Sequence, residues 1–179
     1  MKDLEPRLYS YKMTHVTGKA PRVYEKELVL PACKPYLREN IQPGQWMAGW
    51  TSKELDHSEK GKERLVYLAL VEAKISLREF DERYQGIPTC VPIQTQTLQC
   101  TECPPEEKEE KDNAPALICK EFYYFGAEHA LKVLPDVPRP KIPEGQDKYG
   151  CKTEGEPATL FISYVRLHTA ECQVSNYII

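Results

Sequence analysis

Short runs of apolar residues separated by polar segments mark this chain, and their spacing predicts a fold rich in β-strands. The apolar residues alternate with polar ones or form short continuous runs, as in strands that are half or fully buried. The clearest run, RLVYLALVEAKI, is filled with β-branched and large apolar side chains. The pattern predicts strands over residues 7–16, 25–33, 46–50, 64–75 and 117–126.

Helical spacing appears in three places between and after these strands. Residues 34–40 carry a proline near the start, which suits the first turn of a helix. Residues 76–84 begin with Ser76 and have Glu79 three positions later, the spacing of a capping box. Residues 156–171 begin with an acidic first turn, and the apolar side chains that follow fall on one face of a helix.

The order of these elements favours an α+β fold. The chain shows no regular alternation of strand and helix, so a doubly wound parallel sheet is not expected. We expect a single domain over residues 1–179, built as a small mixed or antiparallel β-barrel with short helices and a C-terminal helix. Residues 85–116 fit neither period and are predicted to be an irregular insertion, in which the charge run EEKEEK is solvated.

Composition and charge limit the possible functions. The 179 residues are 41% hydrophobic and carry a net charge of −3, from 24 basic and 27 acidic residues. Such a chain has no basic field for long contacts with a nucleic-acid backbone. The apolar runs are too short to span a bilayer and the first residues form no apolar leader, so we expect a cytoplasmic protein without membrane contact.

The cysteines are the first candidates for metal chemistry. Cys100 and Cys103 form a Cys-x-x-Cys pair, with Cys90 and Cys119 on either side. A zinc site needs four converging ligands, usually as two tight pairs, and only one such pair is present. We therefore expect reduced thiols and no metal, with a zinc site as the alternative. Neither a Walker loop nor a Gly-x-Gly-x-x-Gly motif occurs, so no nucleotide cofactor is expected.

The segment 31–54 concentrates cations, aromatic rings and hydroxyls. Lys34 and Arg38 are four residues apart, so they share one face of the predicted helix and suit an anion, or are simply solvated. Trp46 and Trp50 fall on one face of the predicted strand. They either pack in the core or offer a stacking surface for a flat base.

Further polar and aromatic groups extend this candidate ligand-binding set. Ser52 and Lys53 follow the strand end directly, where a hydroxyl and an ammonium group suit a phosphate or only solvate a turn. Tyr11 and Tyr124 lie on predicted flanking strands and would complete the wall of a pocket. The sequence alone does not identify a catalytic residue or an oligomeric state.

Six segments in this order resemble a known family. LYSY, GKAP, LPACKPYLREN, PGQWMAGWTSK, RLVYLALVEAKISLREFDERY and EFYYFG together resemble the nucleotide-modification-associated domain family of phages and bacteria. The resemblance covers about residues 7–84 and 117–126. The strand order also looks like the core of PUA-like barrels, whose EVE and YTH members hold a single modified base in an aromatic pocket.

The resemblance implies recognition of a nucleotide or modified nucleobase, either free or as a single base of DNA. It implies a place in phage or bacterial DNA modification, or in sequestering a host nucleotide signal as an anti-defence protein. The alternative is an enzyme of nucleotide or base modification, with Cys33 or Glu54 as its acid or base. This chain departs from the family at Gln45, where relatives are acidic, and at CVPIQTQTLQC, where relatives carry an Asp-Asn-Ile-Tyr-His-like segment. Recognition is therefore implied more strongly than chemistry.

Overall fold

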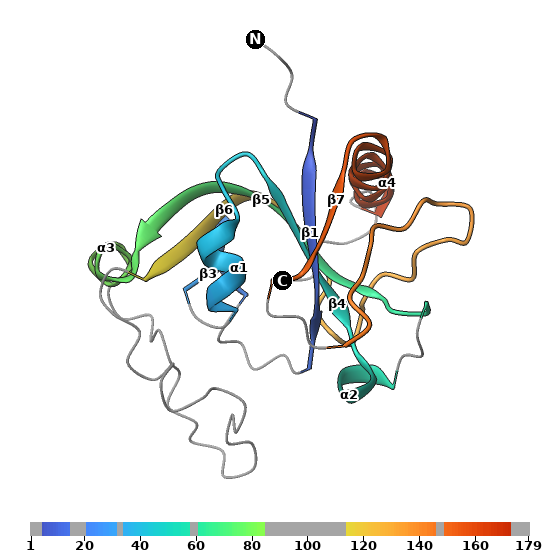
Figure 1. The fold of residues 1–179 in the computed structure, drawn as a ribbon, viewed down its shortest axis with the longest axis horizontal. Coiled ribbons are helices and arrows are strands. Elements are labelled where there is room, and N and C mark those ends of the chain that lie inside the picture. Colours follow the sequence, from blue (N-terminus) through green and yellow to red (C-terminus); the bar gives the residue numbers. More distant parts are fainter. Residues whose placement is uncertain are drawn as a thin grey trace.

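A curved β-sheet with helices on both faces forms the described part of the protein (Figure 1). The computed structural model describes residues 5–14, 21–31, 34–57, 61–84, 114–145 and 149–172. The strands are β1 Arg7–Met13, β2 Arg22–Tyr24, β3 Glu27–Leu30, β4 Trp46–Thr51, β5 Leu65–Ser76, β6 Pro115–Tyr124 and β7 Cys151–Glu154. The helices are α1 Pro35–Asn40, α2 Lys53–Asp56, α3 Leu77–Arg83 and α4 Glu156–Cys172.

The strand order in this seven-stranded sheet is β2-β3-β6-β5-β4-β1-β7. All neighbours are antiparallel except β1 and β4, which pair in parallel. The parallel pair requires a long connection, and the chain makes it through β2, β3 and α1. Bulges interrupt the pairing of β4 with β5 and of β5 with β6. Bulges bend strands and increase their twist, which accounts for the curvature.

The mixed α+β class with a mostly antiparallel sheet is as the sequence predicts, but the closed barrel is not observed. Within the described residues, β2 and β7 stand at the two ends of the strand order and do not pair with each other. Both strands are short and neither was predicted. Closure depends on pairing between the outermost strands, which local patterns along the chain do not encode.

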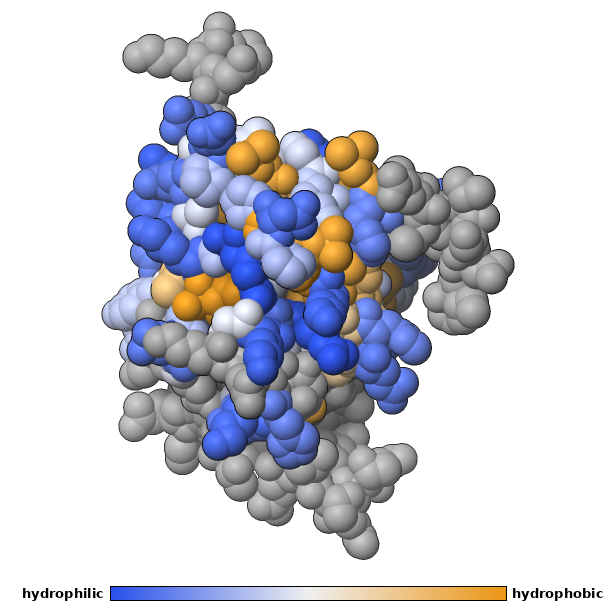
Figure 2. All heavy atoms as spheres, turned by 90° about the vertical axis from the view of Figure 1, so that its right-hand side faces the viewer, coloured by the Kyte–Doolittle hydropathy of each residue, from blue (hydrophilic) through white to orange (hydrophobic). Residues whose placement is uncertain are grey.

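The two faces of the sheet carry different helices. Alternate residues of β1 point to opposite faces, so Leu8 packs in the cluster under α4 while Tyr11 and Met13 pack in the cluster with α1. Helix α3 covers a third cluster around Val29 and Phe80. On the side of the molecule that includes α4, apolar surface appears as separate patches between hydrophilic residues (Figure 2).

Local sequence signals predicted three of the helices correctly. The Ser76 hydroxyl accepts a hydrogen bond from the backbone N–H of Glu79, which confirms the predicted cap of α3. Helix α2 was missed inside a segment predicted to be a polar loop. It is a single turn whose Leu55 packs against the core, so tertiary contact supports it. No helix among the described residues has the length and apolar character needed to cross a membrane.

Candidate functional site

Helix α1 is held against the sheet by side chains that bind backbone carbonyls. Arg38 is fully buried, and its Nη1 donates to the carbonyl oxygen of Pro31 at 3.0 Å and to that of Pro115. Lys74 donates from Nζ to the carbonyl oxygens of Glu39 and Ile41 at the C-terminal end of the helix. Burial lowers the pKa of Lys74. Arg38 thus attaches α1 to the ends of β3 and β6, and its contact with a ligand stays a prediction.

The start of α1 places Lys34 over the ring of Tyr11. Lys34 is the N-cap residue and adopts a left-handed backbone with φ of 50°. Its Nζ lies 5.5 Å from the centroid of the Tyr11 ring. A cation at this distance from an aromatic face is attracted by the ring quadrupole. The left-handed backbone is uncommon for lysine, and such conformations often occur at functional positions.

Tyr11 in turn contacts Tyr67 on β5. Their hydroxyl oxygens lie 2.6 Å apart, and their rings meet edge to face with centroids 6.1 Å apart. Both residues are buried. Burial, followed by the neighbouring Tyr11, raises the pKa of Tyr67 well above its ordinary value. The phenol of Tyr67 therefore stays neutral at physiological pH and can both donate and accept hydrogen bonds.

A glycine makes room for this pair of tyrosines. Gly49 lies on β4, between β1 and β5, and pairs directly with Tyr67. A Cβ at position 49 would lie 2.3 Å from Cε1 of Tyr67 and 2.6 Å from Sδ of Met13. The Tyr67 ring therefore crosses β4 in the space that a side chain at residue 49 would occupy.

Tyr124 completes what we call the tyrosine cluster, defined as Tyr11, Tyr67 and Tyr124 with Lys34. Tyr124 is the cross-strand partner of Tyr67, is partly buried, and packs against the same core. Burial raises the pKa of Tyr124. The structure thus brings together three predicted site residues through Tyr67, which sequence reasoning missed. The signal for Tyr67 was a hydroxyl-bearing side chain within the otherwise apolar first part of β5.

The two tryptophans lie on the opposite face, beneath α4. Trp50 is fully buried, with its ring centroid 5.5 Å from that of Phe161. Trp46 is 5% exposed and also packs in the α4 cluster. Arginine side chains lie over both rings, Arg139 over Trp50 and Arg166 over Trp46. The structure therefore does not bring the tryptophans to the tyrosine cluster, and stacking on a base stays a prediction.

Ser52 and Lys53 lie at the start of α2, beyond the end of β4. Ser52 is buried as the N-cap residue, whereas Lys53 is exposed. Next to them, the pKa of Glu54 is lowered by a backbone hydrogen bond and by the Ser52 hydroxyl, with further contributions from the charges of Lys12 and Lys53. Glu54 is thus an exposed, ionised carboxylate at neutral pH.

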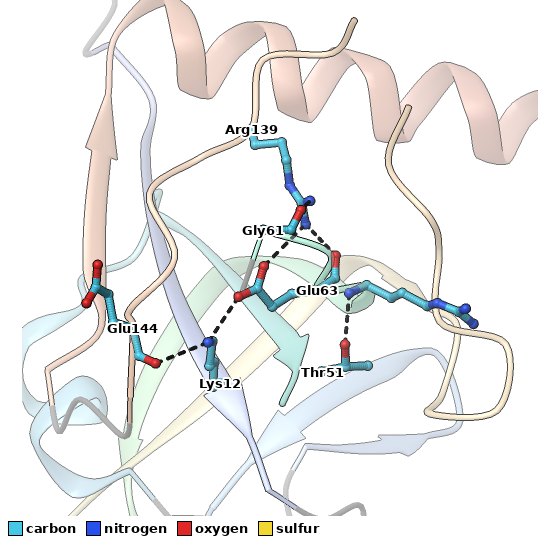
Figure 3. A network of polar contacts seen from close by, with 7 residues as sticks. Lys12, Thr51, Gly61, Glu63, Arg139 and Glu144 are labelled. Atoms are coloured by element: carbon cyan, nitrogen blue, oxygen red, sulfur yellow. Dashed lines mark hydrogen bonds and ion pairs between the residues drawn. The ribbon is translucent and has the colours of Figure 1, made fainter. Parts of the chain in front are cut away.

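A polar network that sequence reasoning did not find lies near this strand end (Figure 3). The Lys12 Nζ lies 3.0 Å from Oε1 of Glu63 and donates to the carbonyl oxygen of Glu144 at 3.3 Å. Arg139 donates to the carbonyl oxygens of Gly61 and Glu63 and lies 3.9 Å from Oε2 of Glu63. The network joins β1, the residues just before β5 and the segment before β7. No local pattern could have revealed it.

Of the cysteines considered as zinc ligands, Cys119 lies within the described residues. Cys33, Cys90, Cys100 and Cys103 lie outside the described residues. Cys119 is buried in the core with α1, and burial raises the pKa of its thiol. In the described segments, no group of three histidine, cysteine or acidic side chains is placed to hold a metal ion.

Comparison with known proteins now gives the class of this protein. Residues 5–103 match the family model "Nucleotide modification associated domain 2", and these are 99 of the 179 residues. The chain therefore belongs to this family, which confirms the resemblance found in the sequence. The matched range includes Tyr11, Lys34 and Tyr67 but not Tyr124 or Arg139. No curated protein and no solved structure matches the chain.

Proposed function

We propose that this chain is a single recognition domain that binds a nucleotide or modified nucleobase at the tyrosine cluster. The observation that carries the proposal is the placement of the Lys34 ammonium over Tyr11, whose hydroxyl lies within hydrogen-bonding distance of Tyr67. A cation beside aromatic rings and neutral phenols suits a ligand with a flat base and an anionic group. Family membership supports the same class of ligand.

The ligand is a free nucleotide or a single base presented by DNA, rather than a long duplex. The net charge of −3 does not favour extended contact with a phosphate backbone. Lys34 provides one positive charge at the cluster, enough for one phosphate group. A role in phage or bacterial DNA modification, or in sequestering a host nucleotide signal in the cytoplasm, is consistent with such a site.

The relation to PUA-like domains belongs to this proposal too. The sheet is curved and bulged, as in part of a barrel, but its strand order is open in the described segments. We therefore propose a PUA-like mode of recognition, in which one face of a curved sheet receives the base. The enzyme alternative gains no support from Glu54, because an exposed carboxylate with a lowered pKa is poorly suited to proton transfer near neutral pH.

Native mass spectrometry of the protein as isolated from cells tests the proposal first. An added mass that matches a nucleotide would identify the ligand directly. Calorimetric titration would follow, with deoxynucleoside monophosphates, the corresponding nucleosides and a short single-stranded oligonucleotide. Competition by duplex DNA then separates a base within DNA from a free nucleotide. Product formation during incubation would indicate an enzyme instead.

Matched variants locate the site. Lys34→Asn removes the ammonium group and tolerates the left-handed backbone, and it should weaken binding of a monophosphate by about tenfold. Lys26→Asn is the control, an exposed turn lysine outside the cluster. Tyr124→Phe should weaken binding by about three- to tenfold if its hydroxyl contacts the ligand. Equal affinities for Lys34→Asn and the control would refute binding at this cluster.

A further inference from the structure

Two tryptophan–arginine pairs lie under and beside α4, and they differ in how the arginine is neutralised. Arg166 lies 5.1 Å from the Trp46 ring centroid and binds Glu121 through two hydrogen bonds of 2.8 and 3.0 Å. Arg139 lies 5.3 Å from the Trp50 ring centroid. Its guanidinium donates to backbone carbonyls, and the carboxylate that it approaches is 3.9 Å away. Among the described residues, only the first pair therefore has a bidentate carboxylate partner.

The Trp50–Arg139 pair also holds two buried donors without an acceptor. Among the described residues, Nε1 of Trp50 and Nε of Arg139 are buried and lack a hydrogen-bond partner. Trp50 is fully buried, so its indole N–H cannot reach bulk water. Both groups are donors only, and an unmet buried donor is costly. Acceptor atoms beside these two donors would satisfy them.

The charge of the surrounding network favours an anion as that acceptor. Lys12 and Arg139 bring two positive charges to the single carboxylate of Glu63. Their side chains are only 11%, 28% and 4% exposed, respectively, so the excess positive charge is poorly solvated. Glu54 also lies near Lys12, but it is exposed and its charge is screened by solvent. The Arg139 side chain is 28% exposed, so a small ligand can approach its outer atoms, whereas its Nε is buried.

We propose that the Trp50–Arg139 pair, with Lys12 nearby, is a binding site for an oxyanion such as a phosphate group. Oxygen atoms of the anion would accept from Nε1 of Trp50 and Nε of Arg139, and its charge would balance the cationic excess of the network in Figure 3. Trp50 and the tyrosine cluster pack on opposite faces of the sheet. The site is thus separate from the proposed nucleotide site, and the anion is either free phosphate or the phosphate of a nucleotide.

Two-dimensional ¹H–¹⁵N NMR of the indole N–H groups tests this site directly. The chain has two tryptophans, and Trp46→Phe assigns the two indole signals. Titration with inorganic phosphate at constant ionic strength should move the Trp50 signal saturably and leave that of Trp46 in place. Arg139→Lys should weaken this response by at least about tenfold, because lysine lacks the planar fork of arginine donors. Arg166→Lys is the matched control and should retain it.

The outcomes separate the source of the anion and the two proposed sites. Saturation by inorganic phosphate indicates a free oxyanion site, whereas saturation by a deoxynucleoside monophosphate alone indicates a nucleotide phosphate. If the Trp50 signal stays in place with both probes, the proposal is overturned. The indole N–H of Trp50 and the Nε–H of Arg139 would then donate to water molecules. The titration of the unaltered protein decides this even if Arg139→Lys fails to fold. Lys34→Asn should leave the phosphate response intact, so failure at one site does not imply failure at the other.

Discussion

The hydroxyl oxygens of Tyr11 and Tyr67 lie 2.6 Å apart although the residues are separated by 56 positions in the chain. The contact spans β4, which lies between the two strands that carry the tyrosines. It depends on the missing side chain at Gly49 and on the packing of α1 on the same face. The centre of the candidate nucleotide site is thus also part of the core, so its residues affect both stability and binding.

Removal of the hydroxyl of Tyr11 or of Tyr67 should destabilise the protein, and the losses of stability from the two changes should not be additive. Tyr67→Phe leaves the buried Tyr11 hydroxyl without this partner, so the free energy of unfolding should fall by about 1–2 kcal/mol. The double variant Tyr11→Phe/Tyr67→Phe should cost less than the sum of the single changes, because the contact between the two hydroxyls can be lost only once. Urea denaturation measures all three. Strictly additive effects would show that the two hydroxyls are not energetically linked.

Gly49→Ala should be more damaging than a single methyl group suggests. The new Cβ would overlap the Tyr67 ring and the sulfur of Met13, and neither can withdraw without disturbing the core. We expect a loss of roughly 1–3 kcal/mol, the usual range for overpacking, with a lower thermal midpoint. Gly145→Ala is the control, because no atom lies within 4 Å of its added Cβ. Similar midpoints for the two variants would contradict the tight fit.

Arg38→Ala should lower stability because the helix attachment is lost. The carbonyls of Pro31 and Pro115 would lose a donor, and a buried gap would open beside α1. A loss of about 2–4 kcal/mol is expected from thermal or urea unfolding. Lys34→Asn, one turn away, should change stability by less than about 0.5 kcal/mol. If Arg38→Ala instead leaves stability unchanged and weakens ligand binding, Arg38 is a ligand contact, as the sequence predicted.

The ion pair between Glu121 and Arg166 should make stability depend on pH in the acid range. Hydrogen bonding by Arg166 lowers the pKa of Glu121 below its ordinary value of 4.5. A carboxylate whose pKa is lower in the folded state stabilises the fold fully at pH values above its pKa in the unfolded state. This stabilisation disappears as the pH falls through the pKa of the folded state. Glu121→Gln should therefore cost up to about 1 kcal/mol at pH 7, since the pair is partly exposed, and progressively less as the pH falls below 4.5.

Denaturation midpoints between pH 3 and 7 would measure this difference. Glu72→Gln is a suitable control, because Glu72 makes a longer, exposed contact of 3.4 Å with Lys120. For the control, the difference in denaturation midpoint from the unaltered protein should vary less between pH 3 and 7. Equal stability of Glu121→Gln and the unaltered protein at pH 7 would mean that the ion pair does not stabilise the fold.

Much of the secondary structure could be predicted because its signals are local. The Ser76 cap, the proline at the start of α1 and the apolar face of α4 all lie within a few residues of the elements that they specify. The family could also be identified from the order of short segments. By contrast, β2 and β7 are too short to show a period, and β7 forms only by pairing with β1.

The sequence by itself determined the α+β class, the main strands, three of the four described helices and the family, because these depend on residues close together in the chain. Tertiary structure alone decided that the described strands form an open sheet, that Arg38 is buried, and that Tyr67 joins Tyr11 to Tyr124. It also decided that Lys12, Glu63 and Arg139 meet. The physical reason is that strand order and register bring distant residues together, and these depend on the packing of the whole sheet rather than on any single segment.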